Sequence, residues 1–575
     1  MAKGKSKTKG KNKGYHKGES RTDLLIYFLA ISPFILGLCK QYLIFGATIF
    51  VLCAILGIGM LSGKMFFYKN PSVLAGAVML ISAVIAIFTG VSHGDAVYGL
   101  ARLLAAGMWV LLLMQLSKED RERSLSILPS AAVIMVLVSA LMYTMPGARD
   151  FVFEHSRLAG FFQYSNTMAL FLLIALVIFT LDGNFEKQKK WKKYSYPIIL
   201  LGGILWTGSR TTFVMTVVVM LILIIRRKEV RRQYSVMMGA GVAAAAGYAV
   251  LFNNTTSVGR FLTIVGKSST LMGRFLYWLD GLKLLVKHPM GLGYLGQFFI
   301  QQSTQSGVYT VRYLHNEWLQ MALDYGIIFL AAFLYLFIHQ LRKTKGLMRW
   351  ILVMIAIHMV MDFDLQYMSM IWLLLTCMDW QEGSKIEVDF GKKKGAKQLT
   401  VSSLVVFAVL FLWLGLADFC YEIKAYDVAA SIYPWSVETK EKQMLSSKTE
   451  EEFERYAKQV LKLNPYDGAA YDILALVASE QEDYMGMVEY KKQAVERQRY
   501  RTEEYEDYVA MLKTAISYYE EKDSEKYQTC VGELLQVEDM LAEVKDGTHS
   551  LAYQINDKPE LELSKETVTY INSFR

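Results

Sequence analysis

Arg210, in the stretch WTGSRTTFV, and Arg274, in MGRFLYW, lie in or beside apolar segments, where a charge is costly and therefore a functional candidate. A guanidinium presents a planar fork of donors that fits phosphate oxygens in pairs and keeps its charge at any working pH. His315 opens the stretch HNEWLQ, between a long polar loop and an apolar segment. Histidine is the side chain best suited to accept a proton near neutral pH. These three residues together suit chemistry on a pyrophosphate ester.

Further polar residues stand near the same predicted membrane face. We predict that six of them contact substrate or support the site: Arg157, Asn166, Asn316, Glu317, Asp324 and Asp362. Asp324 follows His315 by nine residues, about 180° of helix rotation, so we expect it on the opposite helix face, together with Glu317. There it would hold a neighbouring helix by hydrogen bonds. Asn316 could either orient the loop or contact a sugar.

Asp362, Phe363 and Asp364 form a DxD motif, which in soluble glycosyltransferases often holds a metal ion with a nucleotide-sugar. Here the motif falls at the predicted exterior end of a membrane segment, where nucleotide-sugars are not expected. The position favours a helix-end or hydrogen-bonding role over metal binding. No CxxC pair exists among the five cysteines, so the sequence gives no case for a zinc site or a disulfide framework. We predict neither a metal nor a cofactor.

Three other polar positions have two interpretations each. Arg102 stands inside an otherwise apolar segment and could pair with Asp95. Arg312 is a candidate site residue, but a solvated loop position is favoured. His288, in KHPMGLGY, could be a second base, although the adjacent proline and glycines favour a turn that folds the loop back over the site.

The elements that must position these residues are membrane helices. The chain has 575 residues, is 53% hydrophobic and has a mean hydropathy of +0.25, which excludes an ordinary soluble protein. Apolar runs of bilayer-spanning length recur from Leu24 to Leu416. The sequence predicts an all-α, polytopic membrane protein with thirteen candidate spans: 22–39, 42–62, 72–91, 96–116, 126–145, 162–181, 194–208, 211–226, 235–252, 316–340, 347–363, 366–380 and 400–422.

The loops support this topology because basic clusters follow only the even-numbered spans. Basic residues gather on the cytoplasmic side of membrane proteins, so they report topology here and not nucleic-acid binding. The lysine-rich segment 1–21 is predicted to be disordered and cytoplasmic. The long loop 253–314 is then exterior. Spans seven, eight, eleven and twelve are short, and one of these pairs could form a re-entrant hairpin.

The tail, residues 423–575, differs in composition from the rest. It contains 19 Lys and Arg against 31 Asp and Glu, a net charge of −12, so the remainder of the chain carries +21. Its apolar positions recur at helical spacing. Tyr466 aligns with Tyr500 and Tyr471 with Tyr505, both 34 residues apart, a period typical of tetratricopeptide hairpins. We predict an extracytoplasmic helical module for protein partners or for positioning, with an irregular helical bundle as the alternative.

Five stretches occur in a fixed order: HSRLAGFFQYSNTMALFLL, WTGSRTTFV, GRFLYWLDGLKLLVKHPMGLGYLGQF, HNEWLQMALDYG and HMVMDFDL. In this order, with the long loop between spans nine and ten, the chain resembles the O-antigen ligase family of polytopic membrane glycosyltransferases, which includes related polysaccharide polymerases. The resemblance covers roughly residues 20–380 and implies a GT-C-like membrane domain at 22–422. The tail is similar to tails of some Gram-positive relatives.

The resemblance implies that a glycan is transferred from undecaprenyl pyrophosphate to an acceptor hydroxyl on the outer face of the cytoplasmic membrane. It implies that Arg210 and Arg274 bind the donor pyrophosphate and that His315 is essential. Arg157 matches a basic position of the family, and Asp324 stands where the family usually has glutamate. The acceptor could be a glycan, a cell-wall polymer, a lipid or a protein, and ligase and polymerase are not distinguished. The alternative functions are a polysaccharide flippase and a membrane-anchored scaffold.

Overall fold

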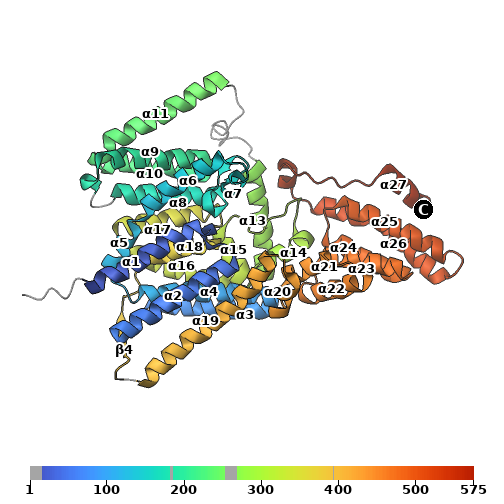
Figure 1. Ribbon diagram of the computed structural model, residues 1–575. Helices are drawn as coiled ribbons and strands as arrows, with labels where there is room; N and C mark the ends of the chain where they lie inside the picture. The colour runs from blue at the N-terminus through green and yellow to red at the C-terminus, as the bar shows by residue number, and fades with distance from the viewer. Residues whose placement is uncertain (1–15, 182–184, 253–268, 393) are drawn as a thin grey trace, which may run out of the picture.

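The structure is a computed structural model that describes residues 16–181, 185–252, 269–392 and 394–575 (Figure 1). Most of these residues lie in α-helices, and the described strands form only two small sheets, so the prediction of an all-α fold is confirmed. Parts of the basic segment 1–21 and of the loop 253–314 fall outside the described residues. Helix α1 (His16–Ile31) begins inside 1–21, so the segment predicted to be disordered includes a helical end.

The apolar helices run in roughly the same direction and form one bundle (Figure 1). Among the described residues, five helical stretches are long and apolar enough to cross a membrane: α2 (Gln41–Ser62), α3 (Pro71–Thr89), α4 (His93–Leu113), the pair α5 (Lys118–Leu125) and α6 (Leu128–Tyr143), and α19 (Lys394–Glu422). The remaining predicted spans correspond to shorter or more polar helices: α8 (Ser165–Leu181), α9 (Lys190–Thr207), α10 (Arg210–Arg226), α11 (Lys228–Phe252), α17 (Gly346–His358) and α18 (Met368–Thr376). Thirteen crossings remain a prediction.

Two predicted spans are not single helices. The span at 316–340 divides into α15 (Glu317–Tyr325) and α16 (Ile327–Lys343), because Gly326 has φ +92°, a left-handed value incompatible with a continuous helix. The span at 22–39 ends in two short 3₁₀ turns around Gly37, which has φ +58°. Uninterrupted hydropathy hides such breaks, because apolar residues fill a broken helix as readily as a straight one.

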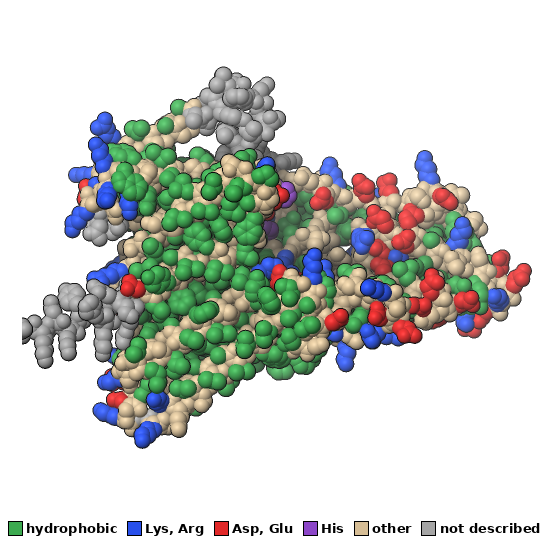
Figure 2. Space-filling view, viewed as in Figure 1, with side chains coloured by type: hydrophobic (Ala, Val, Ile, Leu, Met, Phe, Trp, Pro, Cys, Tyr) green, Lys and Arg blue, Asp and Glu red, His purple; other side chains and the backbone are tan. Residues whose placement is uncertain are grey.

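The two ends of the bundle differ in structure and charge. At one end, β1 (Lys64–Lys69), which follows α2, pairs antiparallel with β4 (Ser384–Asp389), which precedes α19. Both strands belong to loops that the charge pattern predicts on one membrane side, and their pairing agrees with that prediction. Hydrophobic side chains cover the flank of the bundle, with Lys and Arg at this end and the acidic residues mostly over the tail at the other (Figure 2).

The loop between the ninth and tenth predicted spans is partly helical. Helix α13 (Ser269–Lys287) lies across the ends of the bundle helices, between them and the tail, and α14 (Gly296–Thr304) follows it (Figure 1). His288 ends α13, and its backbone oxygen accepts a bond from the amide of Gly291, which has φ +93°. The segment is therefore the predicted turn.

The tail folds into successive helices: α20 (Tyr426–Ile432), α21 (Val437–Leu445), α22 (Glu450–Leu463), α23 (Gly468–Glu480), α24 (Tyr484–Arg497), α25 (Thr502–Tyr519), α26 (Ser524–Gly547), the 3₁₀ turn η7 (Ser550–Gln554) and α27 (Lys565–Asn572). Helix α24 begins 34 residues after α22, and α25 begins 34 residues after α23. This spacing matches the tyrosine period of the sequence. Assignment of the tail to the tetratricopeptide class stays a prediction.

Candidate functional site

Asp362 lies at the centre of a buried polar cluster near the end of the bundle that faces the tail. Its side chain is fully buried and accepts bonds from the Tyr164 hydroxyl at 2.6 Å and from Asn166 Nδ2 at 2.7 Å. An Arg274 guanidinium nitrogen lies 3.4 Å from Oδ2, and His315 Nδ1 lies 3.4 Å from Oδ1. Four predicted site residues, Asp362, Asn166, Arg274 and His315, therefore meet around one carboxylate.

Arg157 joins this cluster from a small hairpin. It begins β3 (Arg157–Leu158), which pairs with β2 (Phe153–Glu154) across a turn. Its guanidinium donates to Asn166 Oδ1 at 2.8 Å and to the backbone oxygen of Thr207, at the end of α9, at 2.7 Å. The arginine thus fixes Asn166 and ties the hairpin to the GSR turn.

Arg210 is the first residue of α10. Gly208 ends α9 in the left-handed conformation, with φ +61°, and Ser209 occupies the N-cap position of α10 without a capping bond from its side chain. This sharp corner leaves the first amides of a 17-residue helix near the arginine side chain. Amides and guanidinium together form an arrangement that favours a phosphate, since a helix N-terminus carries partial positive charge.

A cavity of ≈ 530 Å³, within the usual size range of ligand pockets, opens where three arginines converge. It is lined by Arg157, Arg210 and Arg274, with apolar side chains such as Val214, Met215, Leu271 and Ile357. Arg274 Nε is buried and has no hydrogen-bond partner among the described residues, which leaves a donor for a ligand. The combination of three cations and an apolar wall suits the anionic head of a lipid.

A second buried network anchors the start of α10 to the DxD motif. Thr212 contacts Ser209 at 3.1 Å and His358 Nε2 at 3.1 Å. The other ring nitrogen of His358 bonds to Asp364, whose second oxygen accepts from the Thr167 hydroxyl at 2.9 Å. All five side chains are buried. The network holds α8, α10 and α17 together behind the cavity.

His315 has a left-handed backbone, with φ +52°, a conformation that costs a non-glycine residue about 1–2 kcal/mol. Such strain persists only where the surroundings impose it, and it is common at functional sites. The next residue, Asn316, caps α15 by accepting the amide of Leu319 at 3.0 Å. Of the two roles considered for Asn316, the structure shows the orienting one.

Glu317 and Asp324 are buried on α15, and their hydrogen bonds within the described part of the chain go to residues other than His315. Glu317 accepts from the backbone amide of Leu365 at 3.2 Å and from Gln366 at 2.9 Å. Asp324 accepts from Gln320 at 2.9 Å. Glu317 thus fixes the loop after Asp362. Asp324 was expected to hold a neighbouring helix, whereas its bond to Gln320 lies within its own helix.

The Asp362 carboxylate lies 3.4 Å from both an Arg274 guanidinium nitrogen and His315 Nδ1. A buried carboxylate needs paired and hydrogen-bonded partners, and these two residues supply them together with Tyr164 and Asn166. The two carboxylates of the DxD motif have separate partners, Asp362 with Arg274 and Asp364 with His358. Among the described residues, no group of three or more His, Cys, Asp or Glu side chains is placed to hold a metal ion.

One pairing expected from the sequence is wrong. Arg102 does not pair with Asp95: it donates to the backbone oxygen of Gln366 at 2.9 Å, because its helix face points toward the loop after Asp362. Arg312 is an exposed loop residue, as the sequence favoured, and it also forms two bonds with Glu438 of the tail, at 2.5 and 2.9 Å.

Two residues of the cluster escaped the sequence analysis. Tyr164 bonds to Asp362 and lies 3.4 Å from His315 Nδ1, and its ring stacks on Phe363 at 4.6 Å between ring centres. Phe363 also contacts the His315 ring edge-on, at 5.0 Å. The polar run QYSN at the start of α8 was a signal for Tyr164, and the only signal for Phe363 was its place between the two aspartates of the DxD motif.

Comparison with known proteins bears on this site. Residues 196–334 match the family model described as O-antigen ligase. The matched segment includes Arg210, Arg274 and the stretch from His315 to Asp324, while Arg157, Asn166 and Asp362 lie outside it. None of the curated proteins matches the chain. The resemblance inferred from the five ordered stretches is confirmed over this segment.

Proposed function

We propose that the chain is an envelope glycosyltransferase. The premise is that residues 196–334 form an O-antigen ligase domain within an all-α membrane protein. It transfers a glycan from undecaprenyl pyrophosphate to an acceptor hydroxyl on the outer face of the cytoplasmic membrane. The observation that carries the proposal is the convergence of Arg157, Arg210 and Arg274 on one cavity, beside the Asp362–His315 pair. This side of the bundle also carries the acidic tail, which the charge pattern predicts to be extracytoplasmic.

The donor is bound through its pyrophosphate. Arg210, Arg274 and the first amides of α10 surround the negative charge, and the apolar side chains of the cavity accept the start of the lipid. Negative charge grows on the pyrophosphate oxygen as its bond to the anomeric carbon breaks. Fixed cations that already point at that oxygen stabilise the transition state more than they stabilise the bound donor. This difference lowers the activation barrier and accelerates the reaction.

His315 acts on the acceptor. His315 Nδ1 faces Asp362 Oδ1 at 3.4 Å, the Tyr164 hydroxyl at 3.4 Å and an Arg274 nitrogen at 3.5 Å. In the reactive tautomer Nδ1 carries its hydrogen toward Asp362, and Nε2 takes the proton from the acceptor hydroxyl. The hydroxyl oxygen then bonds to the anomeric carbon, and the electron pair of the breaking bond leaves with undecaprenyl pyrophosphate. Asp362 keeps the ring oriented and stabilises the imidazolium, as a carboxylate does in other histidine-dependent transferases and hydrolases.

Reconstitution of the full chain with an undecaprenyl-pyrophosphate glycan and measurement of released undecaprenyl pyrophosphate tests the proposal. We expect His315→Ala to lower kcat by about 10²-fold or more, the usual contribution of a general base. Arg210→Ala and Arg274→Ala should lower kcat/KM for the donor by at least about tenfold each. Gly202→Ala in α9, where an added methyl meets no atom within 4 Å, is the matched control.

The outcomes separate the candidate functions. Full turnover in all three variants, with the fold intact, would exclude this site. Movement of the lipid-linked glycan across the membrane without release of undecaprenyl pyrophosphate would identify a flippase instead. Product length distinguishes ligase from polymerase, since a polymerase extends its product by successive repeat units and a ligase transfers one glycan.

A further inference from the structure

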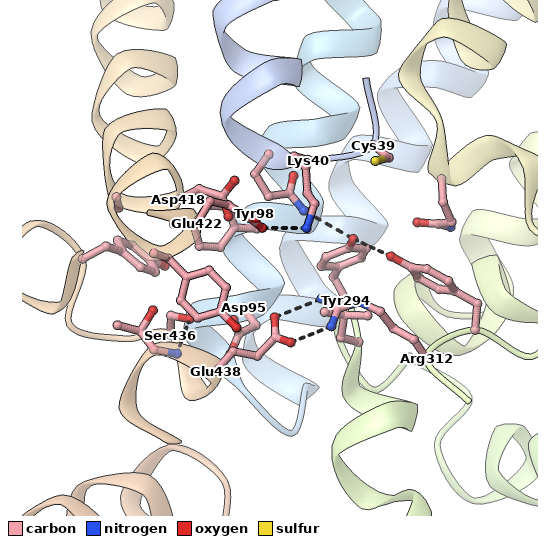
Figure 3. Close-up of a pocket in the computed structure, with 18 of the residues that line it drawn as sticks. Cys39, Lys40, Asp95, Tyr98, Tyr294, Arg312, Asp418, Glu422, Ser436 and Glu438 are labelled. Atoms are coloured by element: carbon pink, nitrogen blue, oxygen red, sulfur yellow. Dashed lines mark hydrogen bonds and ion pairs between the residues drawn. The ribbon is translucent and has the colours of Figure 1, made fainter. Parts of the chain in front are cut away.

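A second pocket, of ≈ 340 Å³, lies between the bundle and the beginning of the tail (Figure 3). Its walls come from the segment around Lys40, the start of α4, the loop before His315, the end of α19 and the tail residues Tyr433–Thr439. None of its lining residues lines the arginine cavity. It is therefore a separate site on the same end of the bundle.

The tail closes this pocket through specific bonds. The Tyr433 hydroxyl donates to the backbone oxygen of Gly94 at 2.8 Å, and the amide of Val437 donates to Asp95 at 3.0 Å. Glu438 holds Arg312 through two bonds (Figure 3). Burial would raise the pKa of Glu438, but Arg312 outweighs it and holds that pKa below the ordinary value. The ion pair thus stays charged, and the docked tail is a wall of the pocket.

The side chains of the pocket are those that recognise sugars. Six tyrosines and Phe363 line it, together with four carboxylates and two cations. A sugar ring presents C–H groups on its faces, which pack on aromatic rings, and hydroxyls on its edge, which donate to carboxylates. Lys40 pairs with Glu422 at 2.8 Å, and Tyr294 contacts Tyr313 at 3.3 Å, so much of this lining is already oriented (Figure 3).

The charge of the pocket selects against anions. Asp95, Asp418, Glu422 and Glu438 exceed Lys40 and Arg312 by two negative charges. An excess of one sign in a concave site repels ligands of that sign and favours neutral or cationic ones. The arginine cavity has the opposite charge, so the pyrophosphate head of the donor and the ligand of this pocket are directed to different sites.

Phe363 connects the two sites. It lines this pocket, follows Asp362 directly in the chain, and its ring contacts His315 at 5.0 Å between ring centres. Tyr313, also in the lining, packs on Phe363 at 5.1 Å and lies two residues before His315. A ligand in the pocket therefore lies one aromatic ring away from the proposed base.

We propose that this pocket binds the acceptor as a glycan whose bound units are neutral or amino sugars, with the tail supplying one wall. This inference rests on the proposed function, because it assigns the acceptor of that reaction. The terminal unit of the bound glycan extends past the edge of the Phe363 ring and places its hydroxyl at His315, which takes the proton. Anionic glycans, such as those bearing uronate or phosphate, are excluded by the carboxylates.

The test is binding of the full chain, in nanodiscs without donor, to an array of oligosaccharides: neutral glucans, N-acetylglucosamine and glucosamine oligomers, uronate oligomers and phosphate-bearing oligomers. We expect retention of neutral or amino oligomers. Tyr421→Ala, which removes a lining ring from α19, should weaken that binding about tenfold. Phe419→Ala, on the same helix but outside the lining, and Arg210→Ala, in the other cavity, should leave binding unchanged.

Strongest binding to anionic oligomers, absence of binding to every oligomer, or equal effects of Tyr421→Ala and Phe419→Ala would each overturn the inference. Turnover gives a second readout: Tyr421→Ala should raise KM for the acceptor and leave KM for the donor unchanged. Binding in the pocket without donor cleavage would overturn the proposed function alone. Donor cleavage and transfer with no dependence on Tyr421 would overturn the pocket assignment alone.

Discussion

At the scale of single residues, Asp362 connects the donor side of the site to the proposed base. Tyr164, Asn166 and Arg274 donate hydrogen bonds to it, and His315 Nδ1 lies 3.4 Å from Oδ1. In Asp362→Asn, the negative charge would be lost, and the amide NH₂, itself a donor, would face the hydrogen-bond donors of these partners. We expect kcat for release of undecaprenyl pyrophosphate to fall by about 10²-fold or more, because His315 loses its orienting carboxylate.

Tyr164→Phe is the matched comparison, since it keeps both the ring and the charge of Asp362. It removes a hydroxyl that donates to Asp362 at 2.6 Å, accepts from Asn166 Nδ2 at 2.9 Å and lies 3.4 Å from His315 Nδ1. Each such bond contributes about 1 kcal/mol, so a loss of about tenfold in kcat, smaller than that of Asp362→Asn, is expected. Equal losses in Asp362→Asn and Tyr164→Phe would show that the charge of Asp362 is unimportant.

The sequence predicted Arg210, Arg274 and His315 because charges and histidine at membrane edges are rare enough to be noticed. It could not predict how they meet. Asn166 and Asp362 are 196 residues apart, and Arg312 finds Glu438 across 126 residues. No local sequence pattern indicates such distant partners. The roles of the DxD motif and of Arg312 were therefore predicted from adjacent residues in the sequence and not from their contacts in space.

At the scale of elements, the corner between α9 and α10 sets the position of Arg210. In Gly208→Ala, a side chain is forced into a left-handed conformation that costs about 1–2 kcal/mol, so we expect the corner to open and the first turn of α10 to shift. KM for the donor should rise several-fold, with a smaller change in kcat. Steady-state kinetics on the reconstituted chain measure both values.

Gly202→Ala, one turn and a half earlier in α9, adds a methyl group in open space and favours the helix, so the donor KM should stay at the wild-type value. A Gly208→Ala variant with unchanged donor KM would contradict the role of this corner.

The positions of most apolar helices could be predicted, because bilayer thickness sets the length of apolar runs, while the number that cross the membrane stays a prediction. The breaks at Gly37 and Gly326 could not, because they depend on backbone conformations that hydropathy does not encode.

At the scale of the whole molecule, the tail holds the membrane domain at two places. Its first part docks on α4 and Arg312, and its last part packs on the helix that carries Arg274. There Ala552 and Ile555 form a cluster with Leu276 and Tyr309, and the amide of Asn556 donates to Ser269 at 2.9 Å. The tail therefore contacts both the proposed acceptor pocket and the helix of the donor cavity, which argues for a role in positioning.

The first of these docking places can be disrupted without changing the tail itself. A Cβ added at Gly94 would lie 1.9 Å from the backbone oxygen of Trp435, closer than any real contact. We expect Gly94→Ala to displace the segment Tyr433–Thr439, to raise hydrogen exchange across it and to raise KM for the acceptor. Gly107→Ala lies on the same helix, where the added methyl meets nothing within 4 Å, and should leave exchange unchanged. Equal protection of residues 433–439 from hydrogen exchange in the two variants would contradict tail docking at α4. A Gly94→Ala chain whose tail segment exchanges faster but whose KM for the acceptor stays at the wild-type value would show that docking does not affect acceptor binding.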